Sequence, residues 1–432
     1  MTRRHRSATW ILTLLSLAAG VLAPRSARSA DPIRVGRAAD VGLSQKKLDA
    51  AVGDYRKVVE ADEIRGAVLL VARRGTVVLH EPLGWSNKAR KQPMRTDTLF
   101  RMASNTKAAI ATGVLQLVES GLVKLDDPIG KHLEAFNNSR CQKITVRGLL
   151  CHTSGLRIKT LFLSPMRKKS PQYPLAPNLQ LEVDRFGDVG PAVEPGTSYS
   201  YSNPGYNTLA VLIEVKSGQP VETYLSQNVY RPLGMKDTSH RPPRGKLRRM
   251  AVVYERIKPK PKTQPKAKAK PKSKSKSKSK SKSQAVAQQE PGSPPKWKVR
   301  FDQSGKMRVP FVRGSGGLVS TSSDFLRFCQ MFLGQGTLGT TRVLRPESVA
   351  EATRIQTRSI YSGEALKKRK RFYGLGWSVR TSGVYGHGGS EGTYAYVDPR
   401  HQLVVLVLTQ SPGGKNPRDE FFEAVVAAIT DG

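Results

Sequence analysis

A run of apolar residues at helical spacing extends from Asn105 to Gly121 and constrains the fold more than any other segment. Alanine, isoleucine, valine and leucine recur there every three or four residues, which predicts a buried helix that ends at Gly121. Ser104 then lies at the first turn, with Lys107 three residues further on the same face. The N-terminus of a helix supplies partial positive charge and free N–H groups that stabilise an oxyanion. The segment therefore predicts a serine nucleophile beside an amine.

The Ser-Xaa-Xaa-Lys pattern carries little information without this context. Ser44 and Lys47 match it at the start of an amphipathic helix, and Ser275 and Lys278 match it inside a lysine-serine repeat. A helix cap beside a solvated lysine explains most single matches of this kind. Of these matches, Ser104 is the one that leads into a buried helix.

A second polar group precedes another apolar helix. Tyr201-Ser202-Asn203 is the one Tyr-Xaa-Asn sequence among thirteen tyrosines. Pro204 suits the first position of a helix, so Tyr201 and Asn203 are expected just ahead of it, on extended backbone. Residues two apart on extended backbone project to the same side. A turn with a packed aromatic side chain is the alternative interpretation of this sequence taken alone.

A third motif lies near the C-terminus, at 387–392 (His-Gly-Gly-Ser-Glu-Gly). Its last five residues match the Gly-Xaa-Ser-Xaa-Gly nucleophile elbow, which requires a strand, a sharp turn and then a helix. Two strand-like segments, 393–397 and 403–409, follow instead. The glycines are better suited to backbone that a ligand approaches closely.

The pattern of apolar and polar residues predicts further helices and strands. A helix capped by Ser44 is expected over 43–60, followed by a hairpin of strands at 66–72 and 76–80. A helix over 322–333 and a terminal helix over 419–429 are also expected. The segment 161–193 is rich in proline and has little periodicity, which predicts an irregular loop beside a substrate cleft.

The first thirty residues have the pattern of an export signal. Three arginines (Arg3, Arg4 and Arg6) precede an apolar run from Trp10 to Ala23, which is short for a membrane span. We therefore expect a signal peptide over 1–30 and an exported protein, periplasmic or extracellular, without a membrane span after cleavage. An uncleaved tether is the alternative.

Cys141, Cys151 and Cys329 cannot all pair. Buried apolar roles are expected for them, a Cys141–Cys151 disulfide being the alternative. Because no metal-ligand spacing occurs in the sequence, it predicts neither a metal nor a cofactor.

A lysine-rich segment interrupts the globular sequence. Twelve lysines, with no acidic residue, fall between Lys258 and Lys282 in Lys-Pro, Lys-Ala and Lys-Ser repeats. This composition predicts a disordered insertion over 258–295. Without these lysines and five leader arginines, the net charge of +39 falls to +22. Weak, salt-sensitive contact with an envelope polymer or another polyanion is therefore expected. Specific nucleic-acid recognition is not, because no aromatic residues interleave with the lysines.

Taken together, the tetrapeptide at 104–107, Tyr201-Ser202-Asn203 and His387-Gly388-Gly389 resemble the three motifs of the serine beta-lactamase and penicillin-binding protein superfamily. Within this superfamily, the chain most resembles class C beta-lactamases, DD-peptidases and related esterases. The segments 149–156 and 316–321 also look like recurrent segments of that family. The resemblance covers about residues 40–430 apart from the lysine-rich insertion. It implies an α+β fold, in which helices flank an antiparallel sheet and a mostly helical domain is inserted.

The resemblance also implies roles for the site residues. Ser104 would be the acylated nucleophile, with Lys107 and Tyr201 moving its proton, and sequence does not decide which of the two is the base. Asn203 would hold the substrate amide or the lysine. The N–H groups of Ser104 and Ser390 would form an oxyanion hole, beside substrate-binding Gly388 and Gly389.

His387 departs from the beta-lactamase pattern, which usually has lysine at this position. Because a histidine is mostly neutral at pH 7, it offers a substrate carboxylate less charge than lysine does. This argues against an efficient beta-lactamase and leaves a serine hydrolase that acts on small esters or D-amino-acid peptides. A true beta-lactamase or DD-carboxypeptidase is an alternative. Another is a non-catalytic envelope-binding protein that uses its basic segment.

Overall fold

A nine-stranded sheet forms the centre of the molecule, with eight strands in the order β1-β3-β2-β15-β14-β13-β12-β11 and β4 paired to β3. The computed structural model describes residues 33–157, 176–257, 295–304 and 311–431. β1 runs parallel to β3, whereas every other neighbouring pair in the sheet is antiparallel. The strands are β1 (Arg34–Val35), β2 (Gly66–Arg73), β3 (Thr76–Asn87), β4 (Gln92–Pro93), β11 (Arg371–Tyr373), β12 (Ser378–Arg380), β13 (Tyr385–Gly388), β14 (Tyr394–Asp398) and β15 (Leu403–Thr409).

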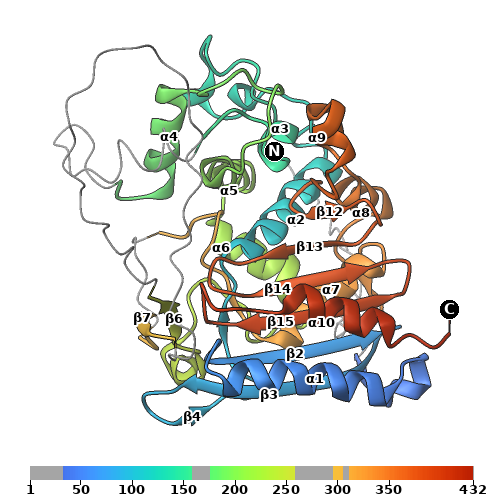
Figure 1. Ribbon diagram of the computed structural model, residues 1–432. Coiled ribbons are helices and arrows are strands. Elements are labelled where there is room, and N and C mark those ends of the chain that lie inside the picture. The colour runs from blue at the N-terminus through green and yellow to red at the C-terminus, as the bar shows by residue number, and fades with distance from the viewer. Residues whose placement is uncertain (1–32, 158–175, 258–294, 305–310, 432) are drawn as a thin grey trace, which may run out of the picture.

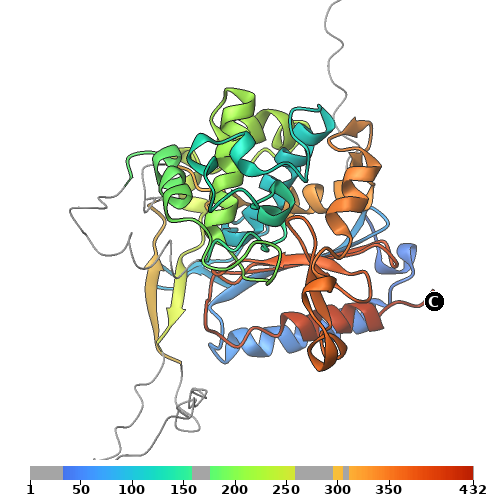
Figure 2. The same cartoon turned by 90° about the horizontal axis from the view of Figure 1, so that it is seen from above.

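Both faces of the central strands are buried. Along β15, Val405 and Val407 pack with α1 (Gln45–Glu60) and α10 (Arg418–Ala427), whereas Leu406 and Leu408 join the larger core on the opposite face. Successive side chains of a strand point to opposite faces, so an uninterrupted apolar run is what a strand between two helical layers requires. Figure 1 shows α1 and α10 side by side on one face, and Figure 2 shows the sheet between this pair and the other helices.

The larger helical layer surrounds α2, whose side chains are buried almost throughout. The helices of this side are α2 (Thr106–Glu119), α3 (Val146–Leu150), α4 (Leu179–Val189), α5 (Asn203–Ser217), α6 (Val221–Leu225), α7 (Ser322–Leu333), α8 (Pro346–Thr353) and α9 (Gly363–Lys367). A single π-helical turn, Ser226–Tyr230, continues α6. Short 3₁₀ helices occupy Ala38–Val41, Ala103–Asn105, Ile129–Lys131, Glu134–Phe136, Arg244–Arg249 and Arg358–Ile360.

Three two-stranded ribbons complete the described elements: β5 (Phe100–Arg101) with β8 (Val319–Ser320), β6 (Val253–Arg256) with β7 (Trp297–Phe301), and β9 (Thr337–Leu338) with β10 (Thr341–Arg342). The β5–β8 ribbon leads directly into the start of α2. The β6–β7 ribbon flanks the lysine-rich insertion, and Ile257 N–H donates to the Lys296 carbonyl at 2.8 Å. Residues 258–294 of the predicted insertion and the predicted leader at 1–30 lie outside the described residues.

The expected α+β fold is confirmed, but the prediction of an irregular loop over 161–193 was wrong in its second half. Residues 179–189 form α4, which Asn178 caps by accepting the Leu181 N–H. Leu179, Val183 and Phe186 are buried at helical spacing. The residues 158–175 of the same segment lie outside the described part.

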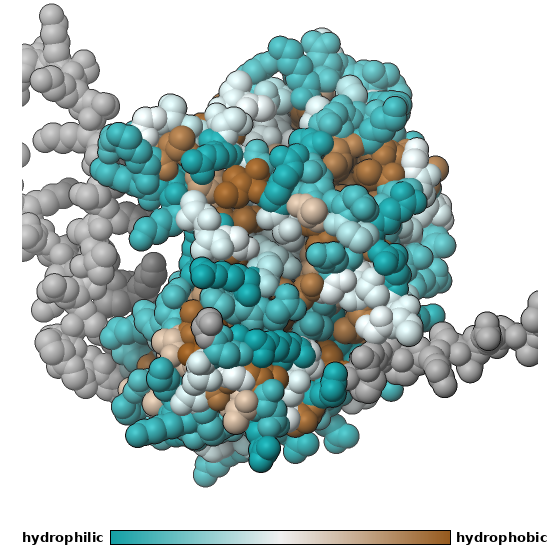
Figure 3. Space-filling view, turned by 90° about the vertical axis from the view of Figure 1, so that its right-hand side faces the viewer, coloured by the Kyte–Doolittle hydropathy of each residue, from teal (hydrophilic) through white to brown (hydrophobic). Residues whose placement is uncertain are grey.

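The surface is mainly polar. On the face shown in Figure 3, hydrophilic side chains cover most of the area, and apolar side chains appear in scattered places between them. Among the described residues, no helix has the length and apolar character to cross a membrane. All three cysteines lie in the described part, where each is buried as a free thiol, as expected.

Candidate active site

The start of α2 places Ser104 at the junction of the sheet and the helical layer. A 3₁₀ turn over Ala103–Asn105 precedes α2, and Ala103 has a φ of 47°, which is rare for a residue with a Cβ. The Asn105 amide fixes this turn, because it donates to the Met102 carbonyl and to Thr393 Oγ1, both at 3.0 Å. Strained backbone that is held by its surroundings in this way is common at functional sites.

Lys107 lies one turn further along α2, and its side chain is fully buried. Its Nζ contacts three oxygens: Ser104 Oγ at 3.2 Å, Asn203 Oδ1 at 2.9 Å and the Ser315 carbonyl at 2.8 Å. The amide oxygen and the carbonyl can only accept hydrogen bonds. Two N–H bonds of a neutral amine are therefore directed to Asn203 and Ser315, which leaves the lone pair toward Ser104.

Burial also favours the neutral amine. It lowers the pKa of Lys107 from 10.5 to about 7, since the charged form loses its hydration. In the described residues, no carboxylate forms an ion pair with Lys107 that would oppose this shift. Lys107 can therefore accept a proton near neutral pH, which an ordinary lysine cannot.

Tyr201 and Asn203 reach the same point from the start of α5. Ser202 caps this helix by accepting the Gly205 N–H, so the helix begins at Asn203, one residue earlier than expected. The Lys107 Nζ lies 4.8 Å from the centre of the Tyr201 ring. Burial raises the pKa of Tyr201 well above its usual value, and a hydrogen bond with Ser104 lowers it only in part. These opposite pKa shifts favour a protonated phenol at Tyr201 and an amine at Lys107 that can take up a proton near neutral pH.

The Ser315 carbonyl is held in place by a chain of buried polar contacts. Ser315 N–H donates to Asn207 Oδ1 at 3.0 Å, and Asn207 Nδ2 donates to Glu182 at 3.2 Å. Arg313 makes two contacts with the same carboxylate, at 2.9 and 3.0 Å. Glu182 belongs to α4, so the helix that the sequence analysis missed supports the lysine. No side-chain motif marks Ser315, because the group that acts is a backbone carbonyl.

His387, on β13, is buried close to Tyr201, with ring centres 6.2 Å apart. Its Nδ1 lies 2.9 Å from the Gly388 carbonyl and its Nε2 lies 2.9 Å from the Tyr373 hydroxyl. Because a carbonyl only accepts, Nδ1 carries the hydrogen and Nε2 accepts from Tyr373. Burial, together with the charge of Lys107, lowers the pKa of His387 to about 3. The ring is thus a neutral imidazole in one fixed tautomer.

The residues after β13 pack against the start of α2. A Cβ added at Gly389 would lie 2.6 Å from the Met102 carbonyl oxygen, so this close approach requires glycine. Ser390 Oγ donates to Glu391 at 2.6 Å. The segment turns directly into β14 rather than into a helix, which confirms that Gly388–Gly392 is not a nucleophile elbow.

His152 is a packing residue that lies beside the site. It has a φ of 64°, is buried, and accepts the Ser202 N–H at Nδ1 over 3.1 Å. Its ring centre lies 4.4 Å from that of Tyr201. The residue therefore packs against the tyrosine and holds the backbone between Tyr201 and Asn203.

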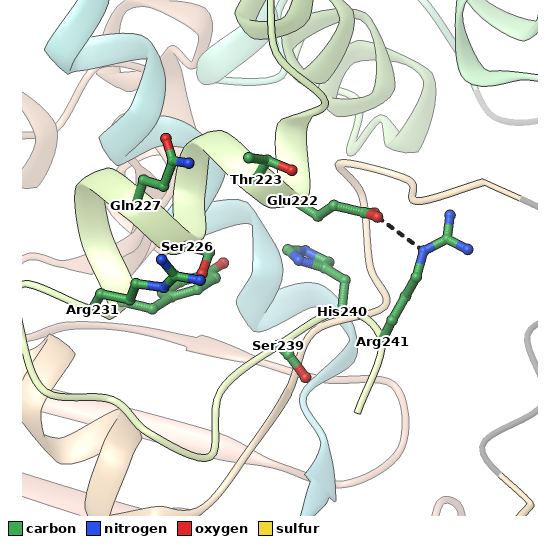
Figure 4. A pocket seen from close by; sticks show the side chains of 9 residues that line it. Glu222, Thr223, Ser226, Gln227, Arg231, Ser239, His240 and Arg241 are labelled. Carbon is green, nitrogen blue, oxygen red and sulfur yellow. Dashed lines mark ion pairs between the residues drawn. The ribbon is translucent and has the colours of Figure 1, made fainter. Parts of the chain in front are cut away.

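A separate polar pocket of about 210 Å³ lies between α6 with its π-helical turn and the loop at Ser239–Arg241 (Figure 4). Glu222 and Arg241 form an ion pair of 2.9 Å at this pocket. A Cβ at Gly317 would lie 3.9 Å from His240, so the pocket adjoins the glycine loop that carries Ser315. None of the three motifs contributes a residue to its lining.

Comparison with known proteins places these motifs in a wider context. The family model described as Beta-lactamase matches residues 52–428. Protein Rv1367c of Mycobacterium tuberculosis is 26% identical over 400 residues, which cover 84% of this chain and 90% of the relative. Penicillin-binding protein 4* of Bacillus subtilis is 32% identical over 186 residues, which cover 43% of this chain and 40% of that protein.

Solved structures share the fold at low identity. EstCE1, a hydrolase with promiscuous acyltransferase activity, has a TM-score of 0.67 at 20% identity and covers 88% of this chain and 98% of its own. The D-amino acid amidase of Ochrobactrum anthropi SV3 has a TM-score of 0.63 at 22% identity, with coverage of 88% and 98%. At such identities, the likeness concerns the fold alone.

Proposed function

The chain belongs to the Beta-lactamase family of serine hydrolases, and on that premise we propose that it acts through an acyl-enzyme on Ser104, with small esters or D-amino-acid peptides and amides as substrates. The observation that carries the proposal is the contact of a fully buried amine, Lys107, with the Ser104 hydroxyl at 3.2 Å. A nucleophilic serine requires an adjacent base, and burial has given this lysine the necessary pKa.

The proton moves in a defined order. Ser104 Oγ loses its proton to neutral Lys107 and bonds to the acyl carbon, and the bond from that carbon to the leaving oxygen or nitrogen breaks. The leaving atom takes a proton through Tyr201, whose high pKa keeps the phenol protonated, and Tyr201 regains one from the Lys107 ammonium. Water then attacks the acyl carbon by the same path in reverse, which releases the acid and restores Ser104.

The substrate oxyanion would lie between the N–H groups of Ser104 and Ser390. The packing of Gly389 against Met102 supports this assignment, because it brings the two segments into direct contact. One donor of this kind contributes about 3 to 4 kcal/mol to the stability of a tetrahedral transition state. Asn203, Gly388 and the neutral His387 would line the rest of the cleft.

His387 favours an esterase or peptidase over a beta-lactamase. Its fixed, uncharged tautomer supplies no positive charge for a substrate carboxylate. Two structural neighbours, a hydrolase with promiscuous acyltransferase activity and a D-amino acid amidase, support ester or amide substrates.

The test is intact mass after incubation with a fluorophosphonate, p-nitrophenyl butyrate or a penicillin. Wild type should gain one adduct on Ser104, whereas Ser104→Ala should gain none and Ser390→Ala, the matched control, should still react. If folded wild-type protein forms no adduct with any probe, the hydrolase proposal is overturned and the envelope-binding alternative is favoured.

We further propose export through the leader at 1–30, and weak polyanion contact through the insertion at 258–295. The leader's arginines followed by an apolar run support export, and the twelve lysines support the contact. Deletion of Lys258–Lys282 should lower the salt concentration at which the protein elutes from an anionic resin, without a change in Ser104 labelling. Elution at an unchanged salt concentration would contradict the second proposal.

A further inference from the structure

The polar pocket between α6 and the Ser239–Arg241 loop (Figure 4) has a volume of about 210 Å³, which is small compared with the sites that hold drug-sized ligands. All its lining side chains carry a polar group. One wall is the π-helical turn Ser226–Tyr230, and such turns occur often at functional sites. The lining residues are Glu222, Thr223, Ser226, Gln227, Tyr230, Arg231, Ser239, His240 and Arg241.

Two buried side chains of this pocket, His240 and Tyr230, differ from the rest in their polar atoms. His240 is 5% exposed, and neither of its ring nitrogens has a hydrogen-bond partner among the described residues. The same holds for the hydroxyl of Tyr230, which is 2% exposed, and the two ring centres lie 6.3 Å apart. Figure 4 shows the His240 ring directed from its loop toward α6. Since a buried polar group without a partner is destabilising, these atoms favour a ligand that pairs with them.

The loop that carries His240 is fixed on both sides of this residue. Ser239 exchanges two backbone hydrogen bonds with Val319 of β8, at 2.8 and 3.0 Å. Arg241 forms an ion pair of 2.9 Å with Glu222 of α6. The ring is therefore held in place before a ligand arrives, which lowers the entropic cost of binding.

The chemistry of the two buried groups favours a ligand with hydroxyl groups. Burial, together with the charge of Arg241, lowers the pKa of His240 to about 4, so the neutral ring offers one N–H donor and one nitrogen acceptor. The Tyr230 hydroxyl likewise donates and accepts. A ligand hydroxyl can pair with either kind of group. An ionised carboxylate or phosphate mainly accepts, and it would leave the acceptor nitrogen of the ring unpaired.

The charged side chains of the pocket also suit neighbouring hydroxyl groups. The charge of Glu222 is balanced by Arg241, and its carboxylate can accept from further donors. The guanidinium of Arg231 has a planar fork of N–H groups, which can donate to two adjacent oxygens. Adjacent hydroxyls on a sugar ring match both side chains, whereas an anion would lie against the Glu222 carboxylate.

We propose that this pocket binds a small polyhydroxylated ligand, of the size of one monosaccharide, through His240 and Tyr230. The lining residues are not those that contact Ser104 and Lys107. Binding here is therefore a further activity, which does not depend on the proposed hydrolase function.

The experiment measures the binding of single sugars to the purified protein by saturation-transfer difference NMR. D-glucose, D-galactose, D-mannose and N-acetyl-D-glucosamine are titrated separately. At least one of them should bind with a dissociation constant of about 1 to 10 mM, as expected for a ligand with so few atoms. Sodium acetate and inorganic phosphate are titrated in the same way as the comparison with anions.

Two variants remove the unpaired atoms with little change of shape. Tyr230→Phe deletes one hydroxyl and should weaken the binding of that sugar about fivefold, the loss expected for one hydrogen bond. His240→Phe removes both ring nitrogens and should weaken it about tenfold or more. Because the Tyr230 hydroxyl has no partner in the part of the chain that the structure describes, Tyr230→Phe should not lower the midpoint of thermal unfolding.

Tyr224→Phe is the matched control. Tyr224 lies on α6 and is half-buried, but it does not line the pocket. The variant loses the same hydroxyl beside the site and should leave the sugar affinity unchanged.

The outcomes decide between a sugar site and its alternatives. Failure of all four sugars to bind wild type overturns the proposal. Binding that Tyr230→Phe and His240→Phe leave unchanged, or that Tyr224→Phe weakens equally, overturns it as well. If acetate or phosphate binds in a way that depends on His240 and no sugar does, the pocket is an anion site and the ligand class is wrong. A lower unfolding midpoint for Tyr230→Phe would contradict the assignment of its hydroxyl to the ligand.

Discussion

Lys107 and His387 are two buried nitrogen bases that both lie close to the Tyr201 ring, yet their surroundings prepare them for opposite roles. Lys107 contacts three oxygens, one of which belongs to the proposed nucleophile, Ser104, and its pKa of about 7 lets it change charge near neutrality. His387 is saturated by one acceptor and one donor, and its pKa of about 3 keeps it neutral. Burial depresses the pKa of both groups, so burial alone does not make a catalyst. The difference lies in what each nitrogen contacts. Lys107 Nζ contacts the Ser104 hydroxyl, whereas both nitrogens of His387 have hydrogen-bond partners outside Ser104.

The largest effect should come from the proposed nucleophile, Ser104, which Lys107 contacts. Ser104→Ala should lower kcat/KM by about 10⁴-fold or more, because no covalent intermediate can form. Ser390→Ala should lower it by less than about tenfold, since the proposed contribution of Ser390 is its backbone N–H. Ester hydrolysis by the two purified variants, with folding checked by circular dichroism, measures the contrast. Equal losses in the two variants would indicate that the Ser390 hydroxyl takes part in the reaction.

Replacing each of the two bases separately tests the comparison directly. Lys107→Met should reduce kcat/KM by about 10² to 10⁴-fold, as expected for the loss of a general base. His387→Gln keeps a neutral donor and acceptor at position 387 and should lower kcat/KM by less than about tenfold. If His387→Gln is as damaging as Lys107→Met, the assignment of Lys107 as the base is wrong.

The pH dependence should follow Lys107 alone. Because the neutral amine is the active form, kcat/KM should rise with pH and level off above a pKa of about 7, falling about tenfold per pH unit well below it. His387→Gln should retain this limb, since His387 stays neutral far below that range. A stopped-flow or plate assay from pH 5 to 9 is sufficient. A limb that shifts by a full unit in His387→Gln would show that the histidine carries charge.

Stability should respond in the same direction. The folded-state pKa of Lys107 lies below its unfolded value of 10.5, so between about pH 7 and pH 10.5 the unfolded chain binds more protons and stability rises with pH. The free energy of unfolding of wild type relative to Lys107→Met should therefore increase from pH 7 to pH 10. Urea titrations at several pH values measure this difference, and a flat difference would argue for a normal pKa.

The smallest effect concerns the tautomer of His387. Tyr373→Phe removes the donor to Nε2 and leaves a buried acceptor unpaired, which should cost about 1 to 3 kcal/mol of stability. The same change in a His387→Leu background should cost much less, because the acceptor is already gone. Equal costs in both backgrounds would show that Tyr373 acts through its other contacts.

The sequence predicted the elements whose information is local. The helix after Ser104 follows from apolar periodicity, and β15 from an uninterrupted apolar run; the resemblance then indicated that the segments around Ser104, Tyr201 and His387 meet. Asn178, followed by Leu179, Val183 and Phe186, carried a helix signal that the prolines upstream obscured. That signal would have found α4.

Other parts of the site have no local signal. The Ser315 carbonyl is a backbone group, and its position depends on Asn207 and Glu182, which are distant in sequence. The same holds for His240, because nothing next to it in the sequence indicates that it is buried at the pocket beside α6. Such groups become visible only when tertiary contacts bring separate segments together, whereas Ser104 and Lys107, one helical turn apart at the start of a buried helix, can be recognised as candidates from the local sequence.

The hydrogen bond between Ile257 and Lys296 at the end of the β6–β7 ribbon has a consequence for how this fold accommodates new sequence. The chain leaves the ribbon and returns to it at one point, so the two ends of the intervening segment lie side by side. Each doubling of a flexible loop costs only about 0.6 kcal/mol. The ribbon is thus a natural grafting point, where a shorter linker, a reporter domain or an affinity tag can replace the native lysine repeats.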